Sequence, residues 1–396
     1  MKSVFGIIAT VFRKEVLENI RERRTLLSAF LFVPLIGPVT FALMTAFIVD
    51  RVVGEADERL RLPVIGAQHA PNLLAFAVEN GATVVKLDID ATAARALIAK
   101  GTENFVLIVS PEVGKQLRDG EPAEIELITD STNNKAQRHV GRMRGIVGAY
   151  SDKVGRLRLL ARGIDPTVIE PFELRTSDIA TPSGRAVALL GTLTYFLLFS
   201  LLMGGMYLAI DVTAGERERG SLESLLCLPV SRAALVFGKI GATMLFMVLS
   251  LCITLTALLI SVQFLPLHKL GMSANFGIVV ALKIAAVMLP MSMLGAALFF
   301  VVGSFTRTYR EAQTWIGLVL AIPTLPIVFA SVLNVRPSIQ LMLIPSMSQH
   351  LIATNLLRGD AVDPAHIAVS VLSTLAAGLI LLWIATRLYD REKLLG

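Results

Sequence analysis

Long apolar runs alternate with polar segments along the 396-residue chain, and the lengths of the runs predict where it crosses a membrane. A helix needs about 20 consecutive apolar residues to cross the hydrocarbon core of a bilayer. Runs of this length predict transmembrane helices at residues 26–49, 186–210, 234–262, 276–303, 312–334 and 365–386. The pattern therefore predicts an α-helical polytopic membrane protein with six transmembrane helices.

Residues 1–25 have the pattern of an amphipathic helix. Phe5, Ile8, Phe12, Val16 and Ile20 recur at helical spacing, with charged residues between them. We expect this helix to lie in the membrane interface. The alternative is the ordinary flank of a signal anchor.

Residues 50–185 are polar and alternate short β-like runs with helix-like runs, which predicts an α/β domain between the first two spans. The domain includes a long helix at 134–162 and a last strand at 172–180. Along the long helix, apolar residues from Val140 to Ala161 step by three and four. Packing of this seam on the domain's own sheet is the favoured interpretation, and a dimer contact is the alternative.

Two further segments are too short and too polar to span the bilayer. Residues 337–358 predict re-entrant or interfacial helices. Residues 213–229 predict one short helix, with a capping box formed by Thr213 and Glu216. Pro229 is expected to end this helix, and Ser231 to cap the next span.

Composition and charge predict the class of the protein and its orientation in the membrane. The chain is 54% hydrophobic and 17% charged, with a mean hydropathy of +0.67, which excludes an ordinary soluble enzyme. Fifteen Lys and Arg residues lie in the segments on the side of the termini, whereas Lys269, Arg336 and Arg358 lie in the short loops on the other side. The positive-inside rule then places both termini in the cytoplasm and the 50–185 domain outside. The net charge of +6 is thus explained by the Lys and Arg residues of the cytoplasmic segments, and we expect no nucleic-acid partner.

Catalytic and metal-binding motifs are absent from the sequence. It contains no phosphate-binding GxxxxGK[ST] loop, no HExxH motif and no GxSxG motif. The five histidines are scattered, and the two cysteines imply no disulfide framework. We therefore expect no catalytic residue, no metal site and no bound cofactor. The protein is expected to move or hold something without supplying its own energy.

The loop DVTAGERERGSLESLLCLPVSRAALVFGKI resembles the signature cytoplasmic loop of type-2 ABC export permeases. The N-terminal VFRKEVLENIRERRTLLSAFLFVPLIGP is similar to the elbow helix and first span of that family, and SFTRTYREAQTW and RLYDREKLLG match in style. The large domain between the first two spans resembles the NatB-like sodium-efflux branch. The resemblance covers essentially the whole chain.

This resemblance implies that 213–229 is a coupling helix, which docks in a cleft of a separate ATPase subunit. It implies charged contacts from Glu216, Glu218 and Arg219, and close packing at Gly220 and Ser221. Ser221 stands where Thr is commoner in the family. Glu223 would brace the helix against the ATPase or the elbow helix, and Pro229 completes the motif. The family also implies a homodimeric permease in the bacterial inner membrane, with ATP and Mg²⁺ on the partner subunits.

The substrate is open at this stage. The NatB-like branch implies sodium or another monovalent cation, but the sequence has no pair of acids within a span to hold one. A lipid, peptide or drug-like substrate is the alternative. A non-transporting scaffold or receptor with an external domain is a second alternative, although it would not need the coupling motif. Five hydroxyl residues within the predicted spans are interpreted as helix-packing residues rather than as substrate ligands: Thr194, Ser200, Thr254, Ser292 and Ser304.

Overall fold

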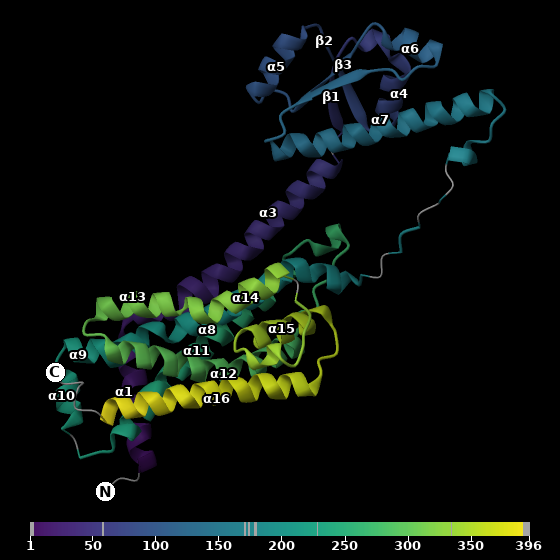
Figure 1. The fold of residues 1–396 in the computed structure, drawn as a ribbon. Helices are drawn as coiled ribbons and strands as arrows, with labels where there is room; N and C mark the ends of the chain where they lie inside the picture. The colour runs from purple at the N-terminus through teal and green to yellow at the C-terminus, as the bar shows by residue number, and fades with distance from the viewer. Residues whose placement is uncertain are drawn as a thin grey trace. The chain divides into compact units, whose positions relative to one another are not determined.

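The computed structural model describes residues 4–57, 59–169, 172, 175–177, 180–227, 229–333 and 335–390. The chain forms two compact units, which are described separately. Residues 1–53 and 179–396 form a helical unit, and residues 54–178 form an α/β unit (Figure 1).

The prediction of six transmembrane helices is confirmed in length and composition. Within the described part of the chain, six helical segments are long and apolar enough to cross a membrane. They are Ala29–Arg51, Leu189–Glu218, Arg232–Gln263, Ile278–Phe305, Tyr309–Ala330 and Pro364–Tyr389. The corresponding main helices are α3 (Gly37–Asp57), α8 (Pro182–Ile210), α11 (Arg232–Gln263), α12 (Ile278–Phe305), α13 (Tyr309–Val319) with α14 (Ala321–Leu333), and α16 (Pro364–Asp390).

The first span differs from its prediction at both ends. It begins after the short helix α2 (Arg23–Leu26) with a π-helical segment, Leu27–Ile36, that contains Pro34. Proline has no N–H to donate within a helix, and a widened turn accommodates its ring. The following α3 continues to Asp57, so the helix extends past the boundary predicted at Val49.

The fifth span consists of two helices rather than one. α13 ends at Val319 and α14 begins at Ala321. Pro323 lies in the first turn of α14, where its missing N–H would otherwise have bonded to the carbonyl of Val319. The proline therefore fixes the position of the break.

Close packing of α8 against α11 and α12 forms the centre of the helical unit. A Cβ atom added at Gly204 of α8 would lie 2.3 Å from Cβ of Ser250 in α11. A Cβ atom at Gly295 of α12 would lie 2.5 Å from Leu202 in α8. Small residues allow helices to approach closely in membranes, where van der Waals packing rather than the hydrophobic effect holds helices together.

The segment between α14 and α16 folds into a short 3₁₀ turn, Leu341–Leu343, and helix α15 (Met347–Arg358). α15 packs against α8, α12 and α16. It is not among the candidate spans, in agreement with the prediction of a short non-spanning element at 337–358. At the start of the helix the backbone N–H of Ser346 donates to Oε1 of Gln349 at 2.6 Å, and Gly359 ends the helix at a φ of 83°.

The α/β unit confirms the predicted alternation of strands and helices closely. Its sheet has the order β2-β1-β3-β4, with β1 (Leu60–Ile65) parallel to β2 (Ala82–Leu87) and to β3 (Phe105–Val109), and with β4 (Ile125–Thr129) antiparallel. The connecting helices are α4 (Pro71–Glu79), α5 (Ala91–Ala99) and α6 (Val113–Asp119). Helix α5 packs on the sheet face that bears Val106, and α4 packs on the opposite face.

The long predicted helix is present as α7 (Asn134–Ala161). Val140 and Met143 are buried against the sheet, and Val147 and Tyr150 pack beside them, so the favoured interpretation is confirmed for the first half of the helix. Leu157 lies 57% exposed in the second half. The dimer alternative for that half stays a prediction.

The predicted last strand at 172–180 is not found where the chain is described. Phe172, Arg175, Thr176, Ser177 and Ala180 have no strand conformation, and the rest of that segment lies outside the described residues. The boundary predicted at 185 is also too late, because α8 already begins at Pro182.

We predict that Gly204→Val lowers the free energy of unfolding by about 1–3 kcal/mol, because the new side chain overlaps Ser250. Thermal unfolding in detergent, followed by circular dichroism, measures the effect. Gly191→Val is the matched control in the same helix, because a Cβ atom there meets nothing within 4 Å. Equal losses in both variants would assign the effect to helix propensity rather than to the α8–α11 contact.

Candidate coupling site at one end of the helical bundle

The loop between α8 and α11 lies at the end of the bundle where α1 (Val4–Arg21) and the last turn of α16 also lie (Figure 1). Helix α8 continues into a π-helical segment, Asp211–Gly215, and then into one turn of α-helix, α9 (Glu216–Glu218). A second short helix, α10 (Ser221–Leu226), follows. The loop is therefore two short elements rather than the single helix predicted at 213–229.

Gly220 separates the two elements because its φ is 69°, a left-handed conformation that costs other residues free energy. A Cβ atom at this position would meet nothing within 4 Å, so Gly220 serves a turn within this chain rather than a close contact. Pro229 does not end the helix, since α10 already ends at Leu226. Ser231 occupies the N-cap of α11 with no side-chain hydrogen bond to the helix.

The predicted capping box at Thr213 and Glu216 is wrong. Thr213 lies inside the π-helical continuation of α8, and its hydroxyl donates to the carbonyl of Ala209 at 2.6 Å. The backbone N–H groups around it are already satisfied by the helix, so no free helix start exists there for Thr213 to cap.

Glu216 forms a buried ion pair with Lys239 of α11. The Lys239 ammonium is fully buried and also donates to the carbonyl of Val212 at 2.9 Å. A buried charge without a partner costs several kcal/mol, so each member of this pair requires the other. The carboxylate of Glu216 therefore points into the chain and is not on the surface predicted to contact an ATPase.

Two charged residues of α1 extend this ion pair. Nζ of Lys14 lies 3.7 Å from Glu216 and 3.2 Å from the buried Glu15. Burial raises the pKa of Glu15 above its ordinary value, while the nearby Lys239 acts in the opposite direction. The four side chains form a cluster of alternating charge that joins the N-terminal helix to the loop.

α1 packs directly on α11 beside this charge cluster. A Cβ atom at Gly238 would lie 2.7 Å from Val11, and one at Gly241 would lie 3.4 Å from Phe12. The buried positions of α1 include Glu15 and Asn19, whereas Phe5 and Ile20 of the predicted apolar face are exposed. The helix thus has one face against α11 and an exposed apolar face beside it, which suits the predicted place at a membrane interface.

Charged residues of α9 tie the loop to two further helices. Arg217 donates to the carbonyls of Ser304 at 3.0 Å and Thr306 at 2.7 Å, which are free acceptors at the end of α12. The carboxylate of Glu218 accepts from the backbone N–H of Tyr309 at 2.6 Å, at the start of α13. An acid at a helix start and a cation at a helix end both complement the helix dipole.

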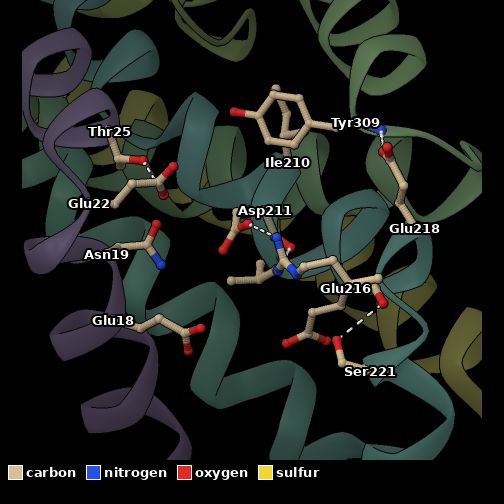
Figure 2. A network of polar contacts seen from close by, with 12 residues as sticks. Glu18, Asn19, Glu22, Thr25, Ile210, Asp211, Glu216, Glu218, Ser221 and Tyr309 are labelled. Atoms are coloured by element: carbon tan, nitrogen blue, oxygen red, sulfur yellow. Dashed lines mark hydrogen bonds and ion pairs between the residues drawn. The ribbon is translucent and has the colours of Figure 1, made fainter.

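Figure 2 shows Asp211, Glu216, Glu218, Ser221 and Tyr309 from close by, with Glu22 and Thr25 of the N-terminal segment. Asp211 accepts from Arg219 at 2.7 Å, and the hydroxyl of Ser221 donates to the carbonyl of Glu216 at 3.2 Å. Glu22 accepts from Thr25 at 2.9 Å at the end of the N-terminal segment. The loop therefore holds its own shape through short-range bonds and reaches its neighbours through Glu216, Arg217 and Glu218.

The exposed part of the site is α10 with its flanks. Leu222 is buried and anchors α10 to the bundle core. The remaining predicted site residues lie on the surface: Glu218, Arg219, Gly220, Ser221, Glu223 and Pro229. Of these, Glu223 has a carboxylate that forms no hydrogen bond or ion pair with another described residue.

Sequence reasoning missed Lys239, Arg217 and Glu15. Lys239 and Arg217 count there only among the fifteen positive charges on the side of the termini, and Glu15 is not singled out. One signal was present: Lys239 stands in an otherwise apolar helical run, where a cation needs an acid nearby. The sequence contains several acids that could pair with Lys239, and only the fold shows that Glu216 does so.

Polar groups deeper in the bundle form hydrogen bonds with other described residues, and the interpretation that they serve helix packing stays a prediction. The hydroxyls of Thr194, Thr254, Ser292 and Ser304 donate to carbonyls of their own helices, and Ser200 contacts Ser250 at 2.9 Å. In the described ranges, no group of three or more His, Cys, Asp and Glu residues could hold a metal ion.

A family model for ABC-2 family transporter proteins matches residues 28–387, which includes the first five candidate spans, the whole loop and all but the last two residues of the sixth span. The chain belongs to the ABC-2 transporter family. It is 26% identical to the ABC transporter permease protein NatB of Bacillus subtilis strain 168 over 387 residues, which cover 96% of this chain and 97% of NatB. This chain is thus a membrane-embedded ABC transporter permease, in agreement with the resemblance of its loop.

We predict that Lys239→Met lowers the free energy of unfolding by about 3–5 kcal/mol, because it leaves the buried carboxylate of Glu216 without its closest cation. Addition of Glu216→Leu should recover most of this loss, since it removes the carboxylate that Lys239 had paired, while Glu15 keeps Lys14 at 3.2 Å. Chemical unfolding in detergent measures both. Arg219→Gln breaks a solvent-exposed pair and is the control, with an expected change of about 0–1 kcal/mol. A double variant as unstable as Lys239→Met would contradict the assignment.

Proposed function

We propose that this permease is the membrane half of an ATP-driven exporter and that α9 and α10 couple it to a separate ATPase subunit. The observation that carries the proposal is the arrangement of the loop. Helix α10 exposes Glu223, and the preceding turn α9 is bonded to α1, α11, α12 and α13. A displacement of α10 would therefore move the ends of several membrane helices together.

The charged residues of this mechanism are of two kinds, those that would contact the ATPase subunit and those that form contacts within the permease. Glu223, Glu218 and Arg219 are the surface groups that would meet the ATPase, and Gly220 and Ser221 lie where a partner could approach closely. Glu216 would act within the permease and pass the motion to Lys239 and Lys14. ATP and Mg²⁺ would be bound by the partner chain, in keeping with the absence of a phosphate-binding loop from this sequence.

The proposed setting is a homodimer with two ATPase subunits in the bacterial inner membrane. α1, the loop with α9 and α10, and the end of α16 share one end of the bundle, where Arg232 donates to the carbonyl of Tyr389 at 3.2 Å. The excess of Lys and Arg in these segments supports a cytoplasmic position for this end and for both termini. The α/β unit would then lie outside the cell, and lipid would surround the bundle.

Export of sodium or another monovalent cation is the substrate proposal that follows from the NatB-like resemblance. The acids of the candidate spans are Asp50, Asp211, Glu216, Glu218 and Glu311, all toward the ends of their spans. A route for sodium would therefore rely on hydroxyl and carbonyl oxygens. An amphipathic substrate is the second candidate, favoured by a basic pocket at the opposite end of the bundle.

We predict that Glu223→Arg abolishes association with the ATPase subunit, because it reverses the charge of an exposed group on α10 without touching the fold. Co-purification and the ATPase rate of the reconstituted complex measure the effect. Glu79→Arg in the α/β unit is the control with the same charge change at another exposed helical position. Normal association of Glu223→Arg would remove α10 from the interface, whereas a scaffold without an ATPase partner would show no association even for the unchanged chain.

The sodium proposal has its own test. Proteoliposomes that contain the permease and its ATPase subunit should accumulate radioactive sodium on addition of ATP, and sodium should raise the ATPase rate. Hydrolysis that is indifferent to sodium, with no flux, would reject cation export and leave the coupling proposal intact.

A further inference from the structure

A pocket of about 520 Å³ opens at the end of the bundle opposite the coupling site. It lies between the first turns of α8, the end of α14 and helix α15. A volume of several hundred cubic ångströms is typical of sites for small molecules. The polar residues of its wall are Thr192, Arg336, His350, Thr354, Asn355 and Arg358.

The charge of the pocket comes from Arg336 and Arg358. Neither guanidinium forms an ion pair with a described residue, and no Asp or Glu is among the residues that line the pocket. Two arginines that share a cavity without a counter-charge repel one another and attract an anion. The same charge disfavours a sodium ion at this place.

An unsatisfied hydroxyl points to a ligand independently of the arginines. Oγ1 of Thr354 is buried at the pocket wall and has no hydrogen-bond partner among the described residues. Buried polar atoms are rarely left without a partner, so such an atom needs an explanation. His350 beside it contacts Thr194, and burial lowers the pKa of His350 to about 4, so its ring is neutral near pH 7.

The rest of the wall is apolar and reaches along α8. Val187, Ala330 and Leu351 line it together with Val335 and Pro337. The lining residues of α8 run from Gly184 to Thr192, which corresponds to about 12 Å of helix. The candidate span of this helix begins at Leu189, so the lining residues of α8 lie on both sides of the start of the span.

We propose that this pocket binds an anionic amphiphile, with a carboxylate or phosphate on Arg336 and Arg358 and an apolar chain along Val187, Ala330 and Leu351. The planar guanidinium presents paired donors that match a carboxylate or phosphate. Thr354 supplies a further hydrogen bond to the head of the ligand. A role of the pocket in export rests on the proposed function, but binding at the pocket does not.

The test uses dansylaminoundecanoic acid with the full-length permease in nanodiscs of zwitterionic phosphatidylcholine, without an ATPase subunit. Dansyl fluorescence gives the Kd. We expect saturable binding that weakens at least about tenfold in the Arg336→Gln, Arg358→Gln double variant, because both charge-assisted hydrogen bonds are lost. Lys283→Gln is the control, since it removes an exposed cation near the same end of the bundle and does not line the pocket.

Thr354→Val separates binding from folding. Since the hydroxyl has no hydrogen-bond partner among the described residues, its removal should leave the thermal stability unchanged or higher, while the Kd for the probe rises. Equal affinity of the unchanged chain and the double variant would overturn the proposal. So would an equal loss in Lys283→Gln, or equal affinity for the uncharged methyl ester of the probe.

Two sources could supply such a ligand, and a competition experiment distinguishes them. Displacement of the probe by phosphatidylglycerol in the nanodisc assigns the pocket to a membrane phospholipid. Retained probe binding in that lipid assigns it to a free amphiphile, and both results support the anionic chemistry. Because no ATPase is present, a failure of this assay and a failure of the coupling proposal can be told apart.

Discussion

The buried ion pair between Glu216 and Lys239 is the interaction on which the end of the bundle depends. It lies at the meeting point of the α8 extension and α11, and Lys14 of α1 adds a second cation to the same carboxylate. In an apolar interior, neither charge is tolerated without the other. The pair therefore fixes where the loop leaves the bundle, and with it the direction in which α10 is presented.

The loop is also the place where sequence reasoning was least accurate, and the cause is physical. Thr213 and Glu216 have the spacing of a capping box, but α8 does not end before them, because a π-helical segment carries it onward. A capping pattern predicts a helix start only if the preceding chain is not helical. By contrast, the strands and helices of the α/β unit and the six spans were predictable, since each depends on its own local periodicity. The surface position of Glu223 agrees with its predicted place on the loop, whereas the partners of Arg217 and Glu15 arise from contacts between distant parts of the chain.

The two ends of the bundle have different chemistry. At the coupling end, Asp211 and Glu216 are paired with cations, and Arg217 and Glu218 bond to the ends of α12 and α13. At the opposite end, Arg336 and Arg358 have no counter-charge among the residues that line the pocket, and the hydroxyl of Thr354 has no hydrogen-bond partner in the described part of the chain. Paired charges stabilise a fixed structure, whereas unpaired ones in a cavity favour a ligand. The contrast agrees with the roles proposed for the two ends, which are contact with an ATPase subunit at one and binding of an anionic amphiphile at the other.

Hydrogen–deuterium exchange of the permease with its ATPase subunit tests the central claim most directly. If the ion pair transmits motion from α10, addition of ATP should change amide exchange in α10 and in α1 together. Glu216, in the turn before α10, contacts Lys14 of α1 and Lys239 of α11 and so links the two helices. In the Glu216→Leu, Lys239→Met variant, α10 should still respond and α1 should not. A response confined to α10 in the unchanged protein, or an undiminished response of α1 in the variant, would contradict the account.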